Sequence, residues 1–481
     1  MALMLRAPRL NRRAFVSELL AGPIAALPFR GRAQGDVDKS VVVQVQPEVL
    51  LGHIPGDFIG LGYEVSSVSE RGLLTAANET YVQFVRTLGP AGVIRIGGDT
   101  SDYASWSADG PAVSSPHSTV VDRQALCDLA SFLRATGWRL IWGLNLGDGS
   151  VEQGVEEATA VAAIAGRSLL AFQIGNEPDL YPGSHRGDDY DYTDYYAEYT
   201  RFKAAIRDKL PNAPFAGPDV FVHTDWLEQF ASTEAHDLQL LTHHYYAEGP
   251  PEDPSSTIET LLTANGALTE LLGRLQSASA FSGVPYRICE ANSCFGGGKH
   301  GVSDTMAASL WGLDYLFQVA AFNAAGVNLE TGVNQLGFMS WYTPIGVDSA
   351  QVYQAKPLYY GMLAFAVAGH GDRVKLMIDT AGLSITAYAM RSDRGAIWLT
   401  LINKDTVCGA NVRAVCPGIT SANALRLTAP SLTSTDGVLL GGTAVSSAGK
   451  WRPGTVEPVR VTGGELETVV PAGSATMIKL R

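Results

Sequence analysis

The chain has 481 residues, of which 46% are hydrophobic and 17% are charged. This length and composition predict a globular protein with two or three domains, or one large barrel with a smaller second domain, and exclude a wholly disordered chain. The formal net charge of −13 disfavours a nucleic-acid binder, because affinity for the phosphate backbone needs clustered cations. We therefore expect no nucleic-acid partner.

The first 35 residues hold four arginines between positions 6 and 13, followed by an apolar stretch over residues 15–29. This beginning resembles a twin-arginine export signal. The apolar stretch is too short and too interrupted to span a bilayer, which takes about 20 apolar residues. We expect a cleavable leader over residues 1–35, a periplasmic or secreted protein, and no membrane anchor. The alternative is a basic N-terminal tail on a cytoplasmic enzyme.

The next segment, residues 36–54, contains SVVVQVQ, whose alternation and valine content predict a β-strand. From residue 58, short apolar runs that end in polar residues alternate with helical segments. Eight β/α units predict a (β/α)₈ barrel over residues 55–368, whereas a doubly wound sheet would need no count of eight. The eight runs are residues 58–66, 93–102, 139–149, 169–179, 213–221, 238–246, 285–293 and 326–332.

The helical pattern disappears near residue 374. Short alternating segments separated by Gly, Ser, Thr and Pro predict a β-sandwich over residues 369–481. The valine strand near the N-terminus has no helical partner close in sequence, so we expect it to join this second domain. The predicted fold is α/β: a TIM barrel with an accessory C-terminal β-sandwich domain that also includes an N-terminal strand.

The five cysteines lack the paired CxxC spacing of a zinc site, and we expect neither a metal nor a cofactor. Cys408 and Cys416 flank a short segment in the strand-rich region, so a disulfide could join them in an exported protein. Cys127 lies in a helical run and is predicted to be buried as a small hydrophobic residue.

Two glutamates follow apolar runs at positions that matter for chemistry. Glu177 ends the fourth run, in FQIGNEPDLY, and Glu290 ends the seventh, in YRICEANS. The C-terminal ends of barrel strands build the active-site face, so these carboxylates are predicted to face each other across the barrel mouth. Glycosidic bond cleavage needs such a pair, one to protonate the leaving oxygen and one to stabilise the sugar carbon. A single glutamate at a loop start is more often a solvated or capping residue.

The motif NEP at the fourth strand, with Glu at the seventh, resembles the signature of the large barrel clan of retaining glycosidases. Within that clan, four segments are similar to glycoside hydrolase family 79, the β-glucuronidases and heparanases. The similarity covers the chain from about residue 37 to its end and implies an exo-acting β-glucuronidase with a carbohydrate substrate. The four segments are residues 95–102 (RIGGDTSD), 174–181 (IGNEPDLY), 242–246 (THHYY) and 290–317.

This resemblance implies a role for each matching residue. Glu177 would be the general acid/base and Glu290 the nucleophile of a retaining enzyme, in which the two carboxyl groups lie about 5–5.5 Å apart. Asn176 would contact the sugar 2-hydroxyl, Tyr246 would hold the nucleophile, and Glu64 would occupy an acidic sugar-binding position.

Other candidate substrate-binding residues bear on the sugar's C6 group. The amides of Gly297 and its neighbouring glycines are implied to cradle a carboxylate. Phe295 stands where we expect a tyrosine in glucuronidases, and Glu330 adds an anion, so a neutral β-glycoside stays open as the substrate. Lys299 is a nearby cation that could compensate. Asp99 and His244 complete the candidate set, although His244 could simply close the sixth strand.

Two rival functions also stay open. A non-catalytic carbohydrate-binding protein could use the tyrosine-rich stretch 188–199. A metallohydrolase could use His243 and His244, but adjacent residues on a strand point to opposite sides and cannot both ligate one metal. The sequence leaves open the aglycone, exo or endo cleavage, and the oligomeric state.

Overall fold

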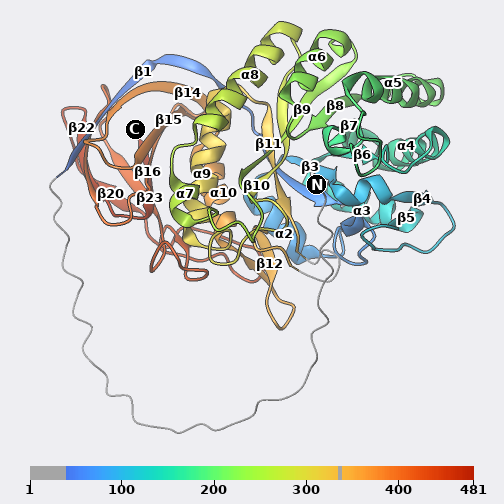
Figure 1. The fold of residues 1–481 in the computed structure, drawn as a ribbon. Helices are drawn as coiled ribbons and strands as arrows, with labels where there is room; N and C mark the ends of the chain where they lie inside the picture. The colour runs from blue at the N-terminus through green and yellow to red at the C-terminus, as the bar shows by residue number, and fades with distance from the viewer. Residues whose placement is uncertain (1–38, 334–338) are drawn as a thin grey trace. The chain divides into compact units, whose positions relative to one another are not determined.

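The structure is a computed structural model that describes residues 39–333 and 339–481. Within these ranges, eight parallel strands close into a barrel (Figure 1). Each strand coincides with one of the eight predicted runs, so the predicted barrel is confirmed. In pairing order the strands are β10 (Tyr286–Cys294), β11 (Gly326–Thr331), β2 (Ile59–Glu64), β3 (Val93–Gly97), β6 (Arg139–Leu144), β7 (Leu169–Ile174), β8 (Phe215–Val220) and β9 (Leu238–Glu248).

The barrel strands are buried on both faces, as expected for parallel strands covered by helices. All residues of β3 and β10 are buried, which explains why their sequences read as apolar runs rather than alternating ones. The helices of the described residues are α1 (Val65–Val68), α2 (Glu79–Leu88), α3 (Arg123–Thr136), α4 (Val151–Ala165), α5 (Tyr192–Lys209), α6 (Thr224–Glu234), α7 (Ile258–Leu262), α8 (Gly266–Ser282), α9 (Met306–Ala321) and α10 (Pro357–Ala368).

Side-chain caps fix where several helices begin. The Asp122 side chain accepts from the backbone N–H of Ala125 at the start of α3, and Ser150 forms a capping box with Gln153 at the start of α4. The loops also contain the 3₁₀ helices η1 (Asp99–Tyr103), η2 (Gly166–Ser168) and η3 (Pro178–Leu180), and the short strands β4 (Ser105–Ser107), β5 (Val120–Asp122), β12 (Ile345–Val347) and β13 (Tyr353–Ala355).

The β part of the predicted fold, with its N-terminal strand, is also confirmed. Its strands hydrogen-bond into one curled sheet, which comprises eleven strands among the described residues. Apart from β20, which pairs with β18, the pairing order is β19-β18-β23-β16-β15-β14-β1-β17-β22-β21. The strands are β1 (Ser40–Ile54), β14 (Gly371–Asp379), β15 (Ile385–Arg391), β16 (Ile397–Asn403), β17 (Ala410–Val415), β18 (Ala422–Thr428), β19 (Leu439–Leu440), β20 (Glu457–Val459), β21 (Val461–Thr462), β22 (Glu465–Val470) and β23 (Ser474–Leu480).

The N-terminal strand lies inside this sheet rather than at its edge. β1 pairs antiparallel with β14, where Val42 is opposite Asp379, and parallel with β17, where Val42 is opposite Arg413. Val41, Val43 and Val45 are buried because their alternation directs them to the sheet's own core. This alternation is the signal that predicted a strand.

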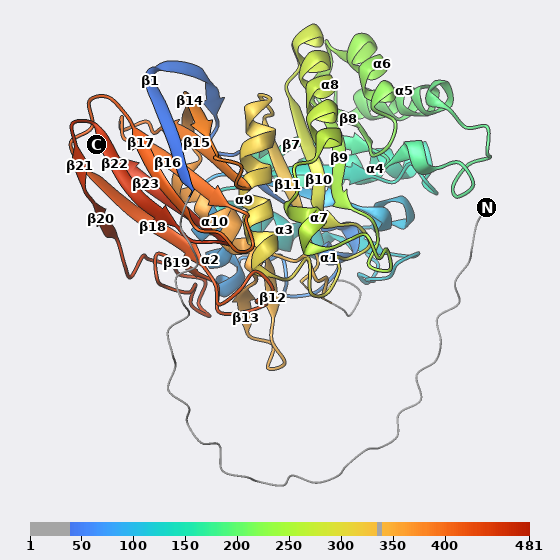
Figure 2. The same ribbon diagram turned by 60° about the vertical axis from the view of Figure 1, so that its left-hand side comes forward.

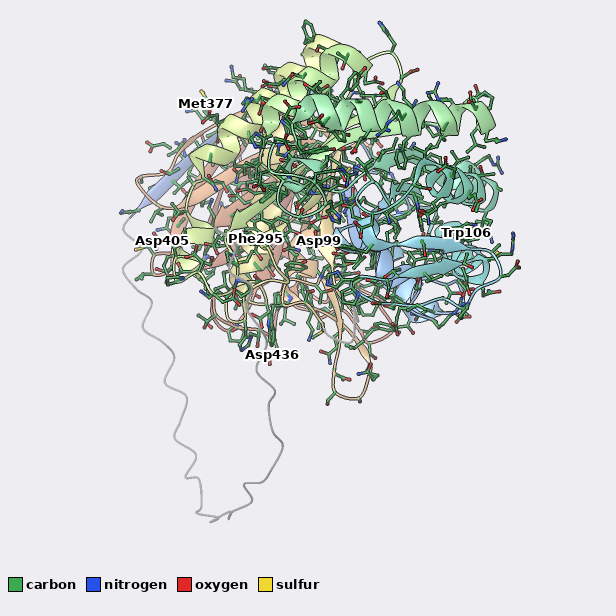
Figure 3. The ribbon with its side chains drawn as sticks, turned by 45° about the vertical axis from the view of Figure 1, so that its right-hand side comes forward. Asp99, Trp106, Phe295, Met377, Asp405 and Asp436 are labelled. Atoms are coloured by element: carbon green, nitrogen blue, oxygen red, sulfur yellow. The ribbon has the colours of Figure 1, made fainter. Side chains whose placement is uncertain are left out.

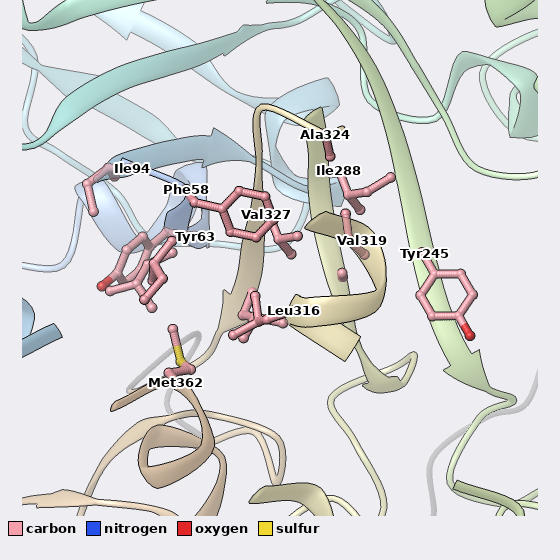
Figure 4. Packing of buried hydrophobic residues seen from close by; sticks show 14 of the residues in the cluster. Phe58, Tyr63, Ile94, Tyr245, Ile288, Leu316, Val319, Ala324, Val327 and Met362 are labelled. Carbon is pink, nitrogen blue, oxygen red and sulfur yellow. The ribbon is translucent and has the colours of Figure 1, made fainter. Parts of the chain in front are cut away.

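Helices α9 and α10 lie between the barrel and the curled sheet (Figure 2). Leu316 and Val319 of α9 and Met362 of α10 pack in the same core as barrel residues such as Val327 (Figure 4). On the sheet side, Asp314 of α9 forms a buried ion pair with Lys404, with Nζ and Oδ2 2.6 Å apart. Apolar packing and a paired buried charge together fix the sheet against the barrel.

The cysteines of the structure test two of the sequence predictions. All five cysteines carry free thiols, so the disulfide considered for Cys408 and Cys416 is not formed in this structure. Cys127 is exposed, and its predicted burial is wrong. Helix α3 buries Ala125, Leu126 and Leu129 instead, which places Cys127 on the solvent face. The predicted leader, residues 1–35, lies outside the described residues.

Candidate active site

The backbone takes an unusual course between the end of β7 at Ile174 and Glu177. Gly175 has a φ of 89° and Glu177 a φ of 47°, so a non-glycine residue occupies the left-handed region. Pro178 then begins η3. The Glu177 backbone N–H donates to the carbonyl oxygen of Asp219 at 3.0 Å, and Asp219 also has a positive φ of 65°. Backbone strain of this kind clusters at functional sites, and here it directs the Glu177 side chain into the barrel mouth.

Glu290 lies in the middle of β10 and faces Glu177. One carboxylate oxygen of Glu177, one of Glu290 and a ring nitrogen of His244 all lie within 4.8 Å of one another. Tyr246 donates its hydroxyl to Glu290 Oε1 at 2.8 Å. The two carboxyl groups are therefore close, as in retaining rather than inverting glycosidases, whose carboxyl groups are about 6.5–9.5 Å apart.

Arg95 is the central cation beneath these carboxylates. Its guanidinium is fully buried and donates to Glu290 Oε2 at 2.6 Å and to Asp219 Oδ2 at 2.7 Å. It also donates to Asn176 Oδ1 at 2.7 Å. Burial opposes the charge, but Asp219 and Glu290 raise the pKa of Arg95 above its ordinary value. Arg95 thus holds Glu290 and Asn176 in fixed positions with a permanent positive charge.

His244 connects the acidic residues behind the cavity. Its Nδ1 lies 2.8 Å from Glu177 Oε1, and its Nε2 lies 3.0 Å from Asp219 Oδ1. Burial by itself would lower the pKa of His244, but the carboxylates of Asp219 and Glu290 raise it well above its ordinary value. A protonated imidazole therefore donates from Nδ1 to Glu177.

Burial raises the pKa of Glu177 to about 7, and the charges of Glu290 and Asp99 act in the same direction. His244 opposes this rise by donating its hydrogen bond. A carboxyl group with a pKa near neutrality can hold a proton for a leaving group and take one from water in the next step.

Two further acids share this environment. Burial, followed by the charge of Asp99, raises the pKa of Glu64 to about 8. Burial, with the charges of Glu290 and Glu64, raises the pKa of Glu330 well above its ordinary value. Neither oxygen of Glu330 has a hydrogen-bond partner within the described residues. The protonated form of Glu330 is therefore favoured, and the repulsion expected from an anion at this position is weakened.

These groups surround a cavity of about 740 Å³ at the C-terminal ends of the strands. Phe295, which is 38% exposed, forms part of its wall and packs edge-on against Phe221 and Tyr246. Asp99 and Phe295 are labelled in Figure 3. The cavity brings together nine of the eleven residues predicted from the sequence: Glu64, Asp99, Asn176, Glu177, Tyr246, Glu290, Phe295, Gly297 and Glu330.

Two predicted residues are not part of this lining. Lys299 donates from Nζ to the carbonyl oxygen of Asp253 at 2.8 Å, so its charge is engaged outside the cavity. It therefore does not supply the compensating cation that the sequence analysis considered. His244 acts from behind the wall, through Glu177.

Sequence reasoning overlooked Arg95, Asp219 and Tyr342 as members of the site. Arg95 had a recognisable signal, since a charged residue within the apolar run VIRIG must find partners when buried. Asp219 lies near the end of the fifth run, as Glu177 lies near the end of the fourth, and the same rule would have found it. Tyr342, a buried residue that lines the cavity, lies in a loop after β11 and had no periodic signal.

Glu177, His244 and Glu290 also have the spacing of a possible metal site. Their ligand atoms already have partners, because His244 pairs with Glu177, and Glu290 accepts from Arg95 and Tyr246. Two cationic side chains next to these carboxylates disfavour a dication. His243 is held elsewhere, with Nδ1 donating to the His244 carbonyl oxygen and Nε2 3.2 Å from Thr224 Oγ1.

A closed (β/α)₈ barrel with one glutamate just after its fourth strand, facing another on its seventh, is the arrangement typical of barrel glycosidases. The comparisons with known proteins agree. Residues 118–317 match the model for the N-terminal domain of glycosyl hydrolase family 79. Over that segment the chain is similar to this family.

Named relatives and solved structures add detail. The chain is 25% identical over 346 residues to a β-glucuronidase of Aspergillus niger, and 26% identical over 319 residues to one of Neurospora crassa. These alignments cover 64% and 57% of this chain but only 63% and 55% of the relatives' own lengths. A 4-O-α-L-rhamnosyl-β-D-glucuronidase from Fusarium oxysporum 12S has the same fold, with a TM-score of 0.77 at 18% identity, covering 91% of this chain and 100% of its own.

Proposed function

We propose that the protein is a retaining β-glycoside hydrolase, with exo-acting β-glucuronidase as its leading activity. The observation that carries this proposal is that Glu177 and Glu290 face each other in one cavity, with a carboxylate oxygen of each within 4.8 Å. Of the two, Glu290 accepts a hydrogen bond from the buried guanidinium of Arg95. The named relatives in Aspergillus niger and Neurospora crassa support glucuronides as the substrate class.

The proposed reaction has two steps. Glu177, protonated below about pH 7, donates its proton to the glycosidic oxygen while a Glu290 oxygen attacks the anomeric carbon. The leaving alcohol departs, and a glycosyl ester of Glu290 remains. Glu177, now a carboxylate, takes a proton from water as the water oxygen attacks the same carbon, which releases the sugar with retained configuration and restores both side chains.

The surrounding residues position these two groups. Arg95 and Tyr246 contact different oxygens of Glu290, so its carboxylate is fixed before the substrate binds. Asn176, held by Arg95, is placed to meet the sugar 2-hydroxyl. The protonated Glu330 and the amides of Gly296 and Gly297, which all line the cavity, can accommodate a uronate.

The leading alternative is a neutral β-glycoside, and Phe295 is the observation that favours it, because a phenyl ring offers no hydroxyl to a carboxylate. A non-catalytic sugar-binding protein has less support, since both carboxylates and their positioning residues are present. Export stays a proposal based on the leader-like segment. Within the described residues, no helix is long and apolar enough to cross a membrane.

The substrate class is tested with p-nitrophenyl β-glucuronide, β-glucoside and β-xyloside, which differ only at C6. We expect the highest kcat/KM for the glucuronide and, by NMR, a β-anomer as the first product. A preference of more than about tenfold for a neutral sugar, about 1.4 kcal/mol of transition-state binding, would overturn the glucuronide assignment. An α-anomer as first product would overturn the retaining mechanism.

The pH dependence should report the Glu177 proton. Because the raised pKa keeps Glu177 protonated only below about 7, we expect kcat/KM to fall as the pH rises through about 7. His244 lowers that pKa, so in His244→Gln the fall of kcat/KM on the alkaline side, the alkaline limb of the pH profile, should occur at a pH about one unit higher. His236→Gln, at an exposed histidine, is the control and should leave the limb in place. An unmoved limb in His244→Gln would contradict the assignment of the limb to Glu177.

A further inference from the structure

One wall of the catalytic cavity is made of side-chain rings that the proposed reaction does not use. These rings come from η1, from the loop between β4 and β5, and from the segment after η3. We call this wall the ring wall, and its members are Tyr103, His117, Tyr181 and His185. Asp99, the first residue of η1, is labelled in Figure 3.

The ring wall lies on the leaving-group side of the cavity. Its residues follow β3 and β7, and Glu177 also follows β7. β3 and β7 are each three strands away from β10, which carries Glu290, in the closed ring of eight strands. In the proposed reaction Glu290 attacks one side of the sugar carbon, and the leaving oxygen departs on the other side, next to Glu177. A group attached to that oxygen would therefore extend toward the ring wall.

The rings of this wall are held by one another. The centroid of the Tyr103 ring lies 4.8 Å from the ring centroids of both His117 and His185. The His185 ring also packs on Tyr181, with centroids 4.9 Å apart, and its Nδ1 lies 3.0 Å from Asp148 Oδ1. Ring faces that are already fixed lose little conformational entropy when a flat ligand packs on them.

Several polar groups along this wall already have partners. The Tyr181 hydroxyl donates to Asp102 Oδ1 at 2.8 Å, and the Ser184 hydroxyl donates toward the carbonyl oxygens of Leu180 and Tyr181, at 3.1 and 3.0 Å. Leu180, which is 44% exposed, adds aliphatic surface to the cavity lining. The hydroxyls of a sugar aglycone would find few free partners here, and each unpaired group costs free energy. A flat apolar ring has no such cost.

The charge of the lining also restricts the aglycone. Among the described residues that line the cavity there is no lysine or arginine. Asp99 and Asp102 precede Tyr103 in η1, so carboxyl groups lie next to the ring wall. A sulfated or uronate aglycone would meet these acids without a cation in the lining to pair with it.

We propose that the ring wall binds an uncharged aromatic aglycone, so that the substrates are β-glycosides of phenols or of alcohols that carry an aromatic ring. This inference rests on the proposed function for the direction in which the leaving group departs. Tyr103 is the specificity-determining residue for the aglycone, because its ring contacts both imidazoles of the wall.

The experiment compares β-glucuronides of 2-phenylethanol, 2-cyclohexylethanol and methanol with a disaccharide in which glucuronic acid is β-linked to O6 of glucose. All four leaving groups are alkoxides that need the Glu177 proton, so differences in kcat/KM report contacts of the aglycone. We expect the highest kcat/KM for the phenylethyl compound. It should exceed the methyl compound and the disaccharide by at least about tenfold, and the cyclohexylethyl compound by at least about threefold.

Variants then test the ring wall itself. Tyr103→Ala should lower the phenylethyl-to-methyl ratio of kcat/KM by at least about tenfold, and Tyr103→Phe by less than about threefold, since a ring face remains. His117→Ala, at an exposed residue, should lower the ratio by at least about threefold and replaces Tyr103→Ala if that variant does not fold. Phe281→Ala removes an exposed ring that does not line the cavity, and this control should leave the ratio unchanged.

The outcomes separate this inference from the proposed function. If glucuronides are cleaved but the disaccharide or the cyclohexylethyl compound matches the phenylethyl compound, or if the ring-wall variants leave the ratio unchanged, the inference is overturned while the proposed function stands. If no glucuronide is cleaved, the proposed glucuronidase activity fails, and the same aglycones on β-glucose decide about the ring wall. If neither series is cleaved, calorimetric titration with the uncleavable 1-thio-β-glucuronides decides, because a phenylethyl compound that binds no more tightly than the methyl compound would exclude the ring wall.

Discussion

Replacement of Glu290 by glutamine is expected to lower kcat by at least about four orders of magnitude on every substrate, the scale seen when an enzyme loses its nucleophile. The amide cannot form the glycosyl ester through which the proposed reaction proceeds. Its oxygen can still accept from Arg95 or Tyr246, which now donate to the two carboxylate oxygens, so the surrounding structure should be retained. The loss should therefore appear in turnover and not in folding.

The measurement is steady-state hydrolysis of an aryl glycoside, together with thermal unfolding of the variant. Glu248→Gln is the matched control, because Glu248 ends the neighbouring strand β9 but does not line the catalytic cavity. We expect that control to retain kcat within about threefold, as for a substitution outside the reacting groups. A folded Glu290→Gln variant with more than about a hundredth of the original kcat would exclude Glu290 as the nucleophile.

Replacement of Glu177 by alanine should give a loss that depends on the leaving group. A dinitrophenolate leaves without protonation, so formation of the glycosyl ester survives, whereas an alkoxide leaving group needs the proton of Glu177 and should react at least about a hundredfold more slowly. With dinitrophenyl substrates the glycosyl ester should accumulate, because no base remains to activate water. A burst of dinitrophenol followed by slow turnover is the expected time course.

Azide provides the diagnostic for this variant. As an anion that needs no general base, it should attack the accumulated ester and restore turnover, yielding a β-glycosyl azide. The same treatment of Glu290→Gln should give no product of retained configuration. If azide rescues the position 290 variant with retention, and not the position 177 variant, the two roles are reversed.

The barrel was predictable because each strand has two signals in the sequence, an apolar run and the polar residues that follow it. Runs such as RLIWGLN and LLAFQIGNEPD are buried on both faces, so their continuous apolar character reflects their surroundings directly. For the curled sheet, the sequence predicted the strands and that the N-terminal strand joins them, but not the pairing order. Which strand pairs with which depends on contacts between residues far apart in sequence, and alternation does not encode them.

The candidate site could be predicted only in part, because some of its residues act through contacts between strands far apart in sequence. Glu177 and Glu290 each follow apolar residues of a run, where a carboxylate has no obvious structural use, so both could be recognised from the sequence. Arg95 lies inside a strand, and its role depends on Asp219 and Glu290 converging on it from other strands. The protonation of Glu330 was also hidden, because it follows from burial beside other acids rather than from residue type.

The place of β1 in the middle of the curled sheet has a consequence for biosynthesis. Val42 pairs with Asp379, 379 − 42 = 337 residues later, and with Arg413 on the other side. During translation, the valine-rich strand therefore emerges before the barrel and has no partner in the sheet until the barrel has been made. Such distant pairing slows folding and leaves an apolar strand edge open to other chains. The curled sheet is thus the last part to be completed, although one of its inner strands is among the first described residues of the chain.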